Sequence, residues 1–239
     1  MALAHSPSIV RNGLVLYLDA ANQKSYPGSG TAWTDLSGNG NNGPLANGPT
    51  YLSANGGAIH FDGVDDNWST TGATPTVLQG DPSFTVFGFF RRTGTMSSDG
   101  CWAIGSSATA AAMCSWCGSA ANDISIDMWS TSTFNSGQTY PLNSWVCAAW
   151  TKTAGAMTRA NCAIFVNGTK YTGTQLTILR AESTAPNINT AGIIVGSIDK
   201  TTINYNSAID VGCISFYSRV LTDAEVDQNF QAHRDRYGI

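Results

Sequence analysis

Short runs of β-prone residues, separated by turn-forming residues, recur along almost the whole chain. Inside these runs apolar residues alternate with other residues at a period of two, which indicates strands and not helices. The run AIFVNGTKY is the clearest case, because Asn167-Gly168 separates two β-prone segments and both residues tolerate the positive φ of a type I′ hairpin turn. The pattern predicts an all-β fold. The segments expected as strands are 14–18, 58–61, 84–90, 124–128, 145–150, 162–166, 193–195 and 211–217.

Two parts of the chain depart from this pattern. The small-residue segment 97–121 fits neither period, and we expect an irregular insertion there. Near the C-terminus, Thr222 and Glu225 have the spacing of a capping box, which predicts a short helix beginning at about Asp223. An apolar stripe follows, and a glycine stands where the helix should end. The stripe is Val226, Phe230 and Tyr237, and the glycine is Gly238.

Length and composition limit the classes of protein that the chain can belong to. With 239 residues, of which 42% are hydrophobic, the chain can bury a full core, and we see no linker that divides it. Charged residues make up 12%, against about 25% in an average soluble protein, so the surface must be largely uncharged and polar. The net charge of −4 and the absence of a basic cluster argue against nucleic-acid binding.

The same inspection gives expectations about membranes, export and redox state. No window approaches the ~18 consecutive apolar residues of a membrane helix. The start MALAHSPSIVRNG lacks a basic region followed by a continuous apolar stretch, so we expect synthesis without a signal peptide. The six cysteines are then made in a reducing compartment, and we expect free, mostly buried thiols. Cys114 and Cys117 form a lone C-x-x-C without the second pair that a zinc site needs.

The order of several segments resembles that of a known family. The segments are LYLDAAN, DLSGNGNNG, GGAIHFDGVDD, SFTVFGFF, NSWVCAAW, AIFVNG and SAIDVGCISFYSRVLTDAEV. Their series resembles the laminin-G-like, concanavalin A-like lectin/glucanase superfamily across almost the whole chain. The start HSPSIVRNGLVLYLDAAN and the end NFQAHRDRYGI look most like copies found in virion proteins of tailed bacteriophages.

This resemblance implies a specific architecture. We expect a two-sheet antiparallel jelly-roll sandwich over about 14–217 with a short C-terminal α-helix. We expect residues 1–239 to form one laminin-G-like domain, with 1–11 as an N-terminal arm and 222–239 as the helix and tail. In the family, DLSGNGNNG is a tight loop between early strands, and Asn and Gly would supply its left-handed backbone conformations.

The resemblance also raises the question of catalysis, since some superfamily members are β-glucanases. A retaining glycosidase needs two carboxylates about 5 Å apart, which the glucanases take from an E-x-D-x-x-E motif. This chain lacks the motif, and its two glutamates are Glu182, in a loop-like AEST, and Glu225, in the capping box. The three histidines, His5, His60 and His233, are scattered through the sequence. We therefore expect no catalytic residues and no enzyme.

A structural Ca²⁺ ion is the cofactor that the resemblance suggests. In the related glucanases an Asp of the final strand ligates calcium in a context like Ala208-Ile209-Asp210, so Asp210 is the candidate ligand. The alternative is that Asp210 hydrogen-bonds a neighbouring loop. The acidic run FDGVDD offers Asp62, Asp65 and Asp66, although a D-G turn explains such residues without an ion.

Carbohydrate binding needs exposed aromatic rings beside polar groups. Trp68 and Trp129 stand near predicted loops and are the candidate sugar-contacting residues, although a tryptophan in a sandwich more often lies in the core.

Together these points predict a non-enzymatic surface protein of a bacteriophage virion, either a capsid decoration or a tail or fibre component, that adheres to host or environmental glycans. A free carbohydrate-binding module is the alternative. The expected partners are capsid or tail subunits and polysaccharide, with many copies or a homo-oligomer on the virion surface. Nucleic acid and membrane are not expected as partners.

Overall fold

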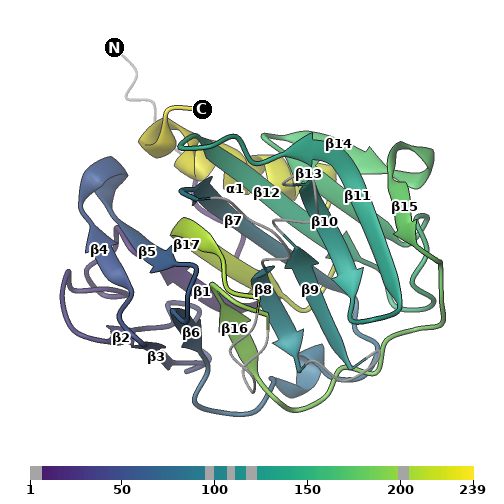
Figure 1. Ribbon diagram of the computed structural model, residues 1–239, viewed down its shortest axis with the longest axis horizontal. Helices are drawn as coiled ribbons and strands as arrows, with labels where there is room; N and C mark the ends of the chain where they lie inside the picture. The colour runs from purple at the N-terminus through teal and green to yellow at the C-terminus, as the bar shows by residue number, and fades with distance from the viewer. Residues whose placement is uncertain (1–6, 95–99, 107–110, 117–122, 199–204) are drawn as a thin grey trace.

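The computed structural model describes residues 7–94, 100–106, 111–116, 123–198 and 205–239, with the side chains of Trp116 and Asp123 left out. In these ranges the strands form two antiparallel sheets that pack face to face, with one α-helix beside them (Figure 1). The predicted all-β, two-sheet jelly-roll sandwich with a C-terminal helix is confirmed. Within the described residues, no helix has the length and apolarity needed to cross a bilayer.

The eight-stranded sheet has the order β14-β13-β12-β7-β17-β5-β4, and β1 also pairs with β17. Its strands are β1 (Leu14–Asp19), β4 (Thr50–Leu52), β5 (Ala58–Asp62), β7 (Phe84–Arg92), β12 (Trp145–Lys152), β13 (Cys162–Val166), β14 (Thr169–Thr172) and β17 (Ala208–Tyr217).

The nine-stranded sheet has the order β15-β11-β10-β9-β8-β16-β6-β3-β2. Its strands are β2 (Ala32–Trp33), β3 (Gly43–Ala46), β6 (Asn67–Ser69), β8 (Gly100–Gly105), β9 (Ala112–Trp116), β10 (Asp123–Met128), β11 (Ser132–Thr139), β15 (Thr177–Arg180) and β16 (Ile193–Val195). The single-turn helices η1 (Ala54–Gly56), η2 (Thr76–Leu78) and η3 (Gly173–Gln175) lie in the connections. The expected irregular insertion at 97–121 is wrong in its described part, because β8 and β9 are paired antiparallel strands with one register shift between Gly100 and Trp102.

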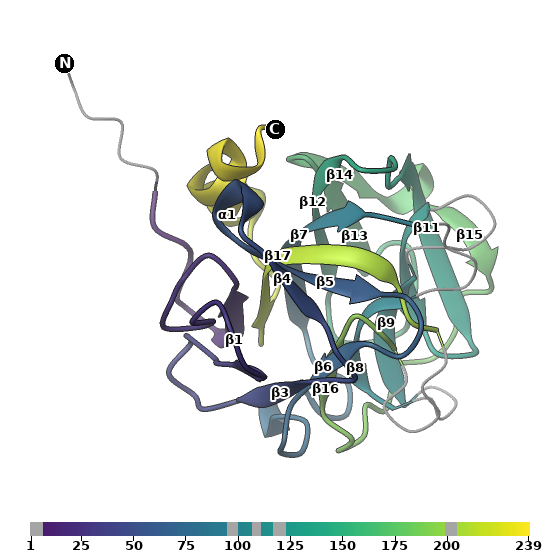
Figure 2. The same cartoon turned by 60° about the vertical axis from the view of Figure 1, so that its left-hand side comes forward.

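The apolar residues of the central strand β7 divide between two cores. Phe84, Val86 and Phe90 face the core between the sheets. Phe87 and Phe89 point the other way and meet the helix α1 (Asp223–Tyr237), which covers the outer face of the eight-stranded sheet (Figure 2). Both faces of β7 are therefore buried, which explains why its sequence is almost continuously apolar.

The caps of α1 follow the sequence signals closely. The Thr222 side chain accepts a hydrogen bond from the backbone N–H of Glu225, and the Glu225 carboxylate accepts one from the N–H of Thr222. Gly238 ends the helix with φ 70°, in the left-handed region that glycine favours. The predicted capping box and helix stop are confirmed, and the helix continues to Tyr237.

Buried polar contacts fix α1 to the sheet. Arg236 Nη1 lies 2.8 Å from Asp19 Oδ1, and the Tyr17 hydroxyl donates to Asp19 Oδ2 at 2.9 Å. Burial is the main cause that raises the pKa of Tyr17 and lowers that of His233, whose Nε2 lies 3.0 Å from the Tyr17 oxygen. Close packing adds to this, because a Cβ placed on Gly212 would lie 2.1 Å from the Tyr237 hydroxyl oxygen.

The turn-rich run DLSGNGNNG is a shaped loop organised by one carboxylate. Asp35 is 8% exposed, and its Oδ1 accepts from the backbone N–H groups of Tyr17 and Ser37. Its Oδ2 accepts from the Ser37 hydroxyl and the N–H of Asn41. In GNGNNG the positive φ values fall on the glycines, at 91° for residue 38 and 74° for residue 40. The asparagines were also expected to take that conformation, but they contribute side-chain hydrogen bonds instead.

The hairpin at Asn167-Gly168 forms as predicted, with φ values of 48° and 84°.

The prediction about the redox state of the cysteines needs a correction. Cys101 is disulfide-bonded, and Cys114, Cys147, Cys162 and Cys213 are free and buried. The expectation of six free thiols is therefore wrong for Cys101.

Candidate functional site

Trp68 cannot serve as an exposed sugar platform. It lies on β6, is 0% exposed, and its Nε1 donates to the carbonyl oxygens of Trp33 at 3.1 Å and Gly43 at 2.8 Å. The prediction for Trp68 is wrong because the residue belongs to the core between the sheets. The sequence held a signal for this, since Asn67 and Ser69 flank the tryptophan with polar residues at strand spacing.

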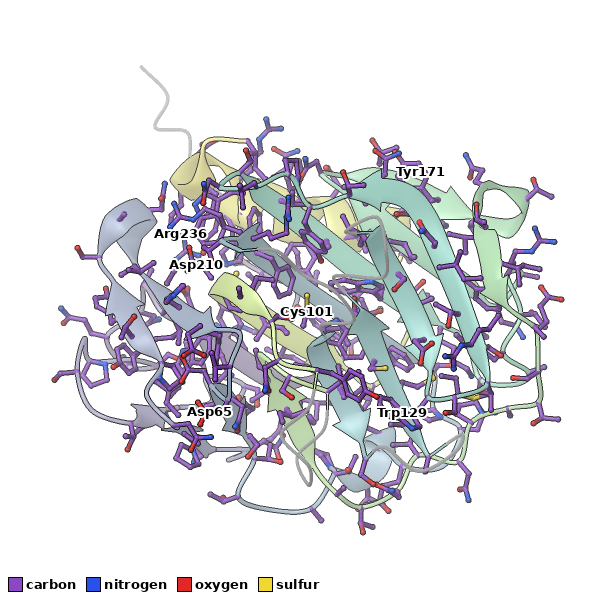
Figure 3. The ribbon with its side chains drawn as sticks, in the orientation of Figure 1. Asp65, Cys101, Trp129, Tyr171, Asp210 and Arg236 are labelled. Carbon is purple, nitrogen blue, oxygen red and sulfur yellow. The ribbon has the colours of Figure 1, made fainter. Side chains whose placement is uncertain are left out.

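Trp129 lies on the opposite surface of the nine-stranded sheet, in the turn between β10 and β11 (Figure 3). It is partly buried and packs against a small apolar cluster that includes Cys114 and Ile194. The Tyr205 ring stands edge-on to it, with centroids 5.4 Å apart and planes at 72°. Tyr205 is 37% exposed and has φ 67°, an unusual backbone conformation for a bulky residue. We call Trp129 and Tyr205 the aromatic corner.

Polar side chains on β9, β10 and β11 lie on the same outer face as the aromatic corner. Asp127 is 2% exposed, and its carboxylate accepts hydrogen bonds from the Thr133 hydroxyl and, at 3.5 Å, from Cys114 Sγ. Burial, followed by the Asp127 charge, raises the pKa of the Cys114 thiol well above its usual value. The alternation DISID predicts this face, because Ser125 and Asp127 point away from the apolar Ile124 and Ile126.

Asp210 is placed as a fully buried partner of two basic side chains. Its Oδ1 lies 2.7 Å from His60 Nδ1, and its Oδ2 lies 2.7 Å from Arg91 Nε and 2.6 Å from Arg91 Nη2. Both carboxylate oxygens are thus engaged, and the guanidinium takes the position that a cation would need. A Ca²⁺ ligand should present a free oxygen, so the surroundings of Asp210 do not fit the predicted calcium ion.

The acidic run after β5 brings three carboxylates together. Ligand atoms of Asp62, Asp65 and Asp66 lie within 4.8 Å of one another. Turn hydrogen bonds account for two of them, because Asp62 Oδ1 accepts from the N–H of Val64 and Asp66 Oδ2 accepts from the N–H of Asp62. Burial, more than the neighbouring charges, raises the pKa of Asp66. These contacts are those of the predicted tight turn.

The remaining residues with catalytic potential lie apart from the aromatic corner. Glu225 belongs to the capping box and is held by Arg219, whose Nη2 lies 2.6 Å from Glu225 Oε1; this pair lowers the pKa of Glu225 to about 2. Glu182 lies 3.6 Å from Arg159 Nε at the surface. His60 is paired with Asp210, and His233 lies on α1 beside the Tyr17 hydroxyl. His5 is outside the described residues.

Comparison with known proteins places the fold. No family model and no curated protein matches the sequence. Among solved structures, Trypanosoma rangeli sialidase in a covalent-intermediate complex matches with a TM-score of 0.65 and 15% identity, over 98% of this chain and 37% of that one. This chain therefore spans little more than a third of the sialidase.

Two further neighbours carry the same sandwich. Domain 4 of AbnA, an extracellular GH43 arabinanase of Geobacillus stearothermophilus in complex with arabinotriose, matches with a TM-score of 0.64 and 12% identity, over 92% of this chain and 98% of that one. The binding domain of botulinum neurotoxin serotype D matches with a TM-score of 0.59 and 12% identity, over 93% and 52%. At these identities the likeness shows the fold alone, which is a two-sheet antiparallel β-sandwich.

Proposed function

We propose that this protein is a non-enzymatic, glycan-adhering surface protein of a bacteriophage virion. The aromatic corner is the observation that carries the glycan part. A ring that is partly exposed beside a tryptophan gives an apolar face for the C–H groups of a sugar. The arabinotriose complex of the structurally similar arabinanase domain supports the same class of ligand.

The non-enzymatic part of the proposal rests on the positions of the glutamates. Glu225 is committed to the helix cap and to Arg219, and Glu182 lies beside Arg159 on another part of the surface. A retaining glycosidase would need two carboxylates about 5 Å apart in one cleft. The three carboxylates that do lie close together, those of Asp62, Asp65 and Asp66, belong to a tight turn with its own hydrogen bonds. Recognition with so few surface charges depends on shape and hydrogen bonding more than on electrostatic steering.

The virion part is supported by the sequence resemblance of the two end segments to phage virion proteins. Weak single-site contacts gain avidity when many copies are displayed with suitable spacing, which favours multicopy attachment to capsid or tail subunits. A mass-spectrometric search of purified particles, followed by microscopy to locate the chain, tests this part. Failure to find the protein in particles would refute it.

A free carbohydrate-binding module is the second candidate. The structural match to the arabinanase domain favours it, because that match covers 98% of a unit that binds a sugar by itself. The N-terminal arm, residues 1–11, distinguishes the two roles, because in the virion role it docks to a neighbouring subunit. Deleting residues 1–8 should lower incorporation into particles while leaving the melting temperature nearly unchanged.

The glycan part is tested by substitution at the aromatic corner. Binding to a panel of soluble polysaccharides is measured by calorimetry for the wild type, for Tyr205→Ala and for the matched control Tyr171→Ala, a partly buried tyrosine on β14 (Figure 3). We expect Tyr205→Ala to weaken binding at least tenfold, about 1.4 kcal/mol, and Tyr171→Ala to leave it unchanged. Full retention of binding by Tyr205→Ala, or no binding to any glycan, would refute the assignment.

A further inference from the structure

A groove lies at the start of β1, beside the shaped loop described above. Its volume is about 390 Å³. It is lined by residues 13–15 with Asn39 and Asn41, which we call its first wall, by residues 75–77, which we call its second wall, and by Ser218. This volume is in the lower part of the range of small-molecule sites, about 300–1,000 Å³. The groove can therefore take a small ligand.

The side-chain amides of Asn39 and Asn41 are oriented by hydrogen bonds to the backbone of β1. Asn39 Nδ2 donates to the carbonyl oxygen of Leu14 at 2.9 Å, and Asn41 Nδ2 donates to that of Val15 at 2.8 Å. The NH₂ ends are thus committed to the β1 backbone. Neither Oδ1 accepts a hydrogen bond from any residue that the structure describes. Two acceptor oxygens consequently remain available to a ligand that can donate.

The lining also limits the charge of the ligand. None of the residues that line the groove is Asp, Glu, Lys, Arg or His. An anion would find no positive partner and a cation no negative one, and leaving either unpaired is costly. Val77, which is 59% exposed, adds an apolar rim. Acceptors beside an apolar rim suit a neutral molecule with hydroxyl donors and C–H faces.

Both walls are held in place before any ligand arrives. Asp35 fixes the first wall through four hydrogen bonds. On the second wall Leu78 is 0% exposed and anchors η2 in the core, and Gln79 Nε2 donates to the carbonyl of Thr74 at 2.7 Å. A site that needs no ordering on binding loses less affinity to conformational entropy.

We infer that this groove is a saccharide site for a neutral sugar, held through its hydroxyl groups by Asn39 and Asn41. The inference extends the proposed function, because the groove is separate from the aromatic corner. Tyr205 precedes the 10-residue strand β17 and Ser218 follows it, so at ~3.3 Å per residue the two places lie about 30 Å apart along the strand. One sandwich would then offer two contacts to a polysaccharide.

The test is an NMR titration of the ¹⁵N-labelled protein with arabinotriose, methyl α-D-mannopyranoside and D-galactose, with sialic acid as the anionic probe. Val77→Arg is designed to fill the groove at an exposed position. Val64→Arg, at a residue 72% exposed on another loop, is the matched control. Asn41→Ala removes one acceptor, and its folding is checked from the dispersion of the remaining signals.

We expect at least one neutral sugar to shift the side-chain amide signals of Asn39 and Asn41 in a saturable way. Val77→Arg should weaken this binding at least tenfold, Val64→Arg should not, and sialic acid should leave these signals in place. The inference is overturned if no neutral sugar shifts them, if Val77→Arg binds as the wild type does, or if sialic acid binds there equally well. Tyr205→Ala should leave the groove shifts unchanged, so failure here is distinguishable from failure at the aromatic corner.

Discussion

Replacing Arg91 with methionine tests the buried ion pair on the outer face of the eight-stranded sheet. Arg91→Met keeps most of the aliphatic side chain and removes the guanidinium that holds Asp210 Oδ2 through two nitrogen atoms. The Asp210 side chain is 0% exposed, so in the intact protein its charge is offset by these partners and not by water. His60 continues to hold Oδ1. The substitution therefore leaves a buried carboxylate with half of its contacts.

The expected cost follows from this geometry. Removing one partner of a buried pair costs about 3–5 kcal/mol. Arg91 is 26% exposed and His60 remains, so we expect the lower end, about 3 kcal/mol. Arg159→Met is the control, since its pair with Glu182 lies at the surface and should contribute less than about 1 kcal/mol.

The loss should also depend on pH, because His60 becomes the main partner of Asp210 in the variant. Its hydrogen bond to Asp210 raises the pKa of His60 in the folded protein. The stability that protonated His60 contributes is therefore fully present below its unfolded pKa of about 6.5 and is lost as pH rises through the folded pKa. Arg91→Met should accordingly be more destabilising at pH 8 than at pH 5.5.

Urea unfolding followed by tryptophan fluorescence measures these changes, with Asp210→Asn added to the Arg91→Met background to remove the buried charge. The second substitution should recover part of the lost stability. A cost below about 1 kcal/mol for Arg91→Met at pH 8, or no recovery in the double variant, would show that Asp210 does not depend on Arg91 as argued.

Three further predictions concern the thiols, the helix cap and calcium. Thiol titration of the denatured, unreduced protein should find fewer than six reactive groups, because Cys101 is disulfide-bonded; six would contradict that bond. Thr222→Ala should lower the free energy of unfolding by about 1 kcal/mol, measured by urea denaturation, through loss of the N-cap; an unchanged midpoint would contradict it. Any effect of Ca²⁺ on the melting temperature should persist in Asp210→Asn, and its loss there would restore Asp210 as a ligand.

The features that could be predicted from the sequence are those set by neighbouring residues. The hairpin at Asn167-Gly168 and the capping box at Thr222 depend on backbone preferences within a few positions, and both formed as expected. Strand positions followed from period-two alternation. The fold class followed from the series of such segments, since each requires the same two-layer burial.

The features that could not be predicted depend on contacts between distant parts of the chain. Asp210 meets Arg91 and His60 from 119 and 150 residues away, so its context in the sequence could not reveal that its oxygens are engaged. Trp68 and Trp129 both stand near turns, and the full burial of one and partial burial of the other depend on which sheet surface each one faces. The strands β8 and β9 were not predicted, because they contain Gly, Ala and Cys. With such small residues the alternation of apolar and polar side chains is weak.

The position of α1 has a consequence for how copies of this protein could be tethered. Ser8 and Val10 are hydrogen-bonded to Gln228 and Asn229 of the helix, so the first described residues and the C-terminal end share the outer side of the eight-stranded sheet (Figure 1). Trp129 lies on the outer side of the other sheet. A tether at either end would leave from the side of the molecule that is turned away from the aromatic corner. Attachment to a support through either terminus would therefore orient the aromatic corner outward, toward the surrounding medium.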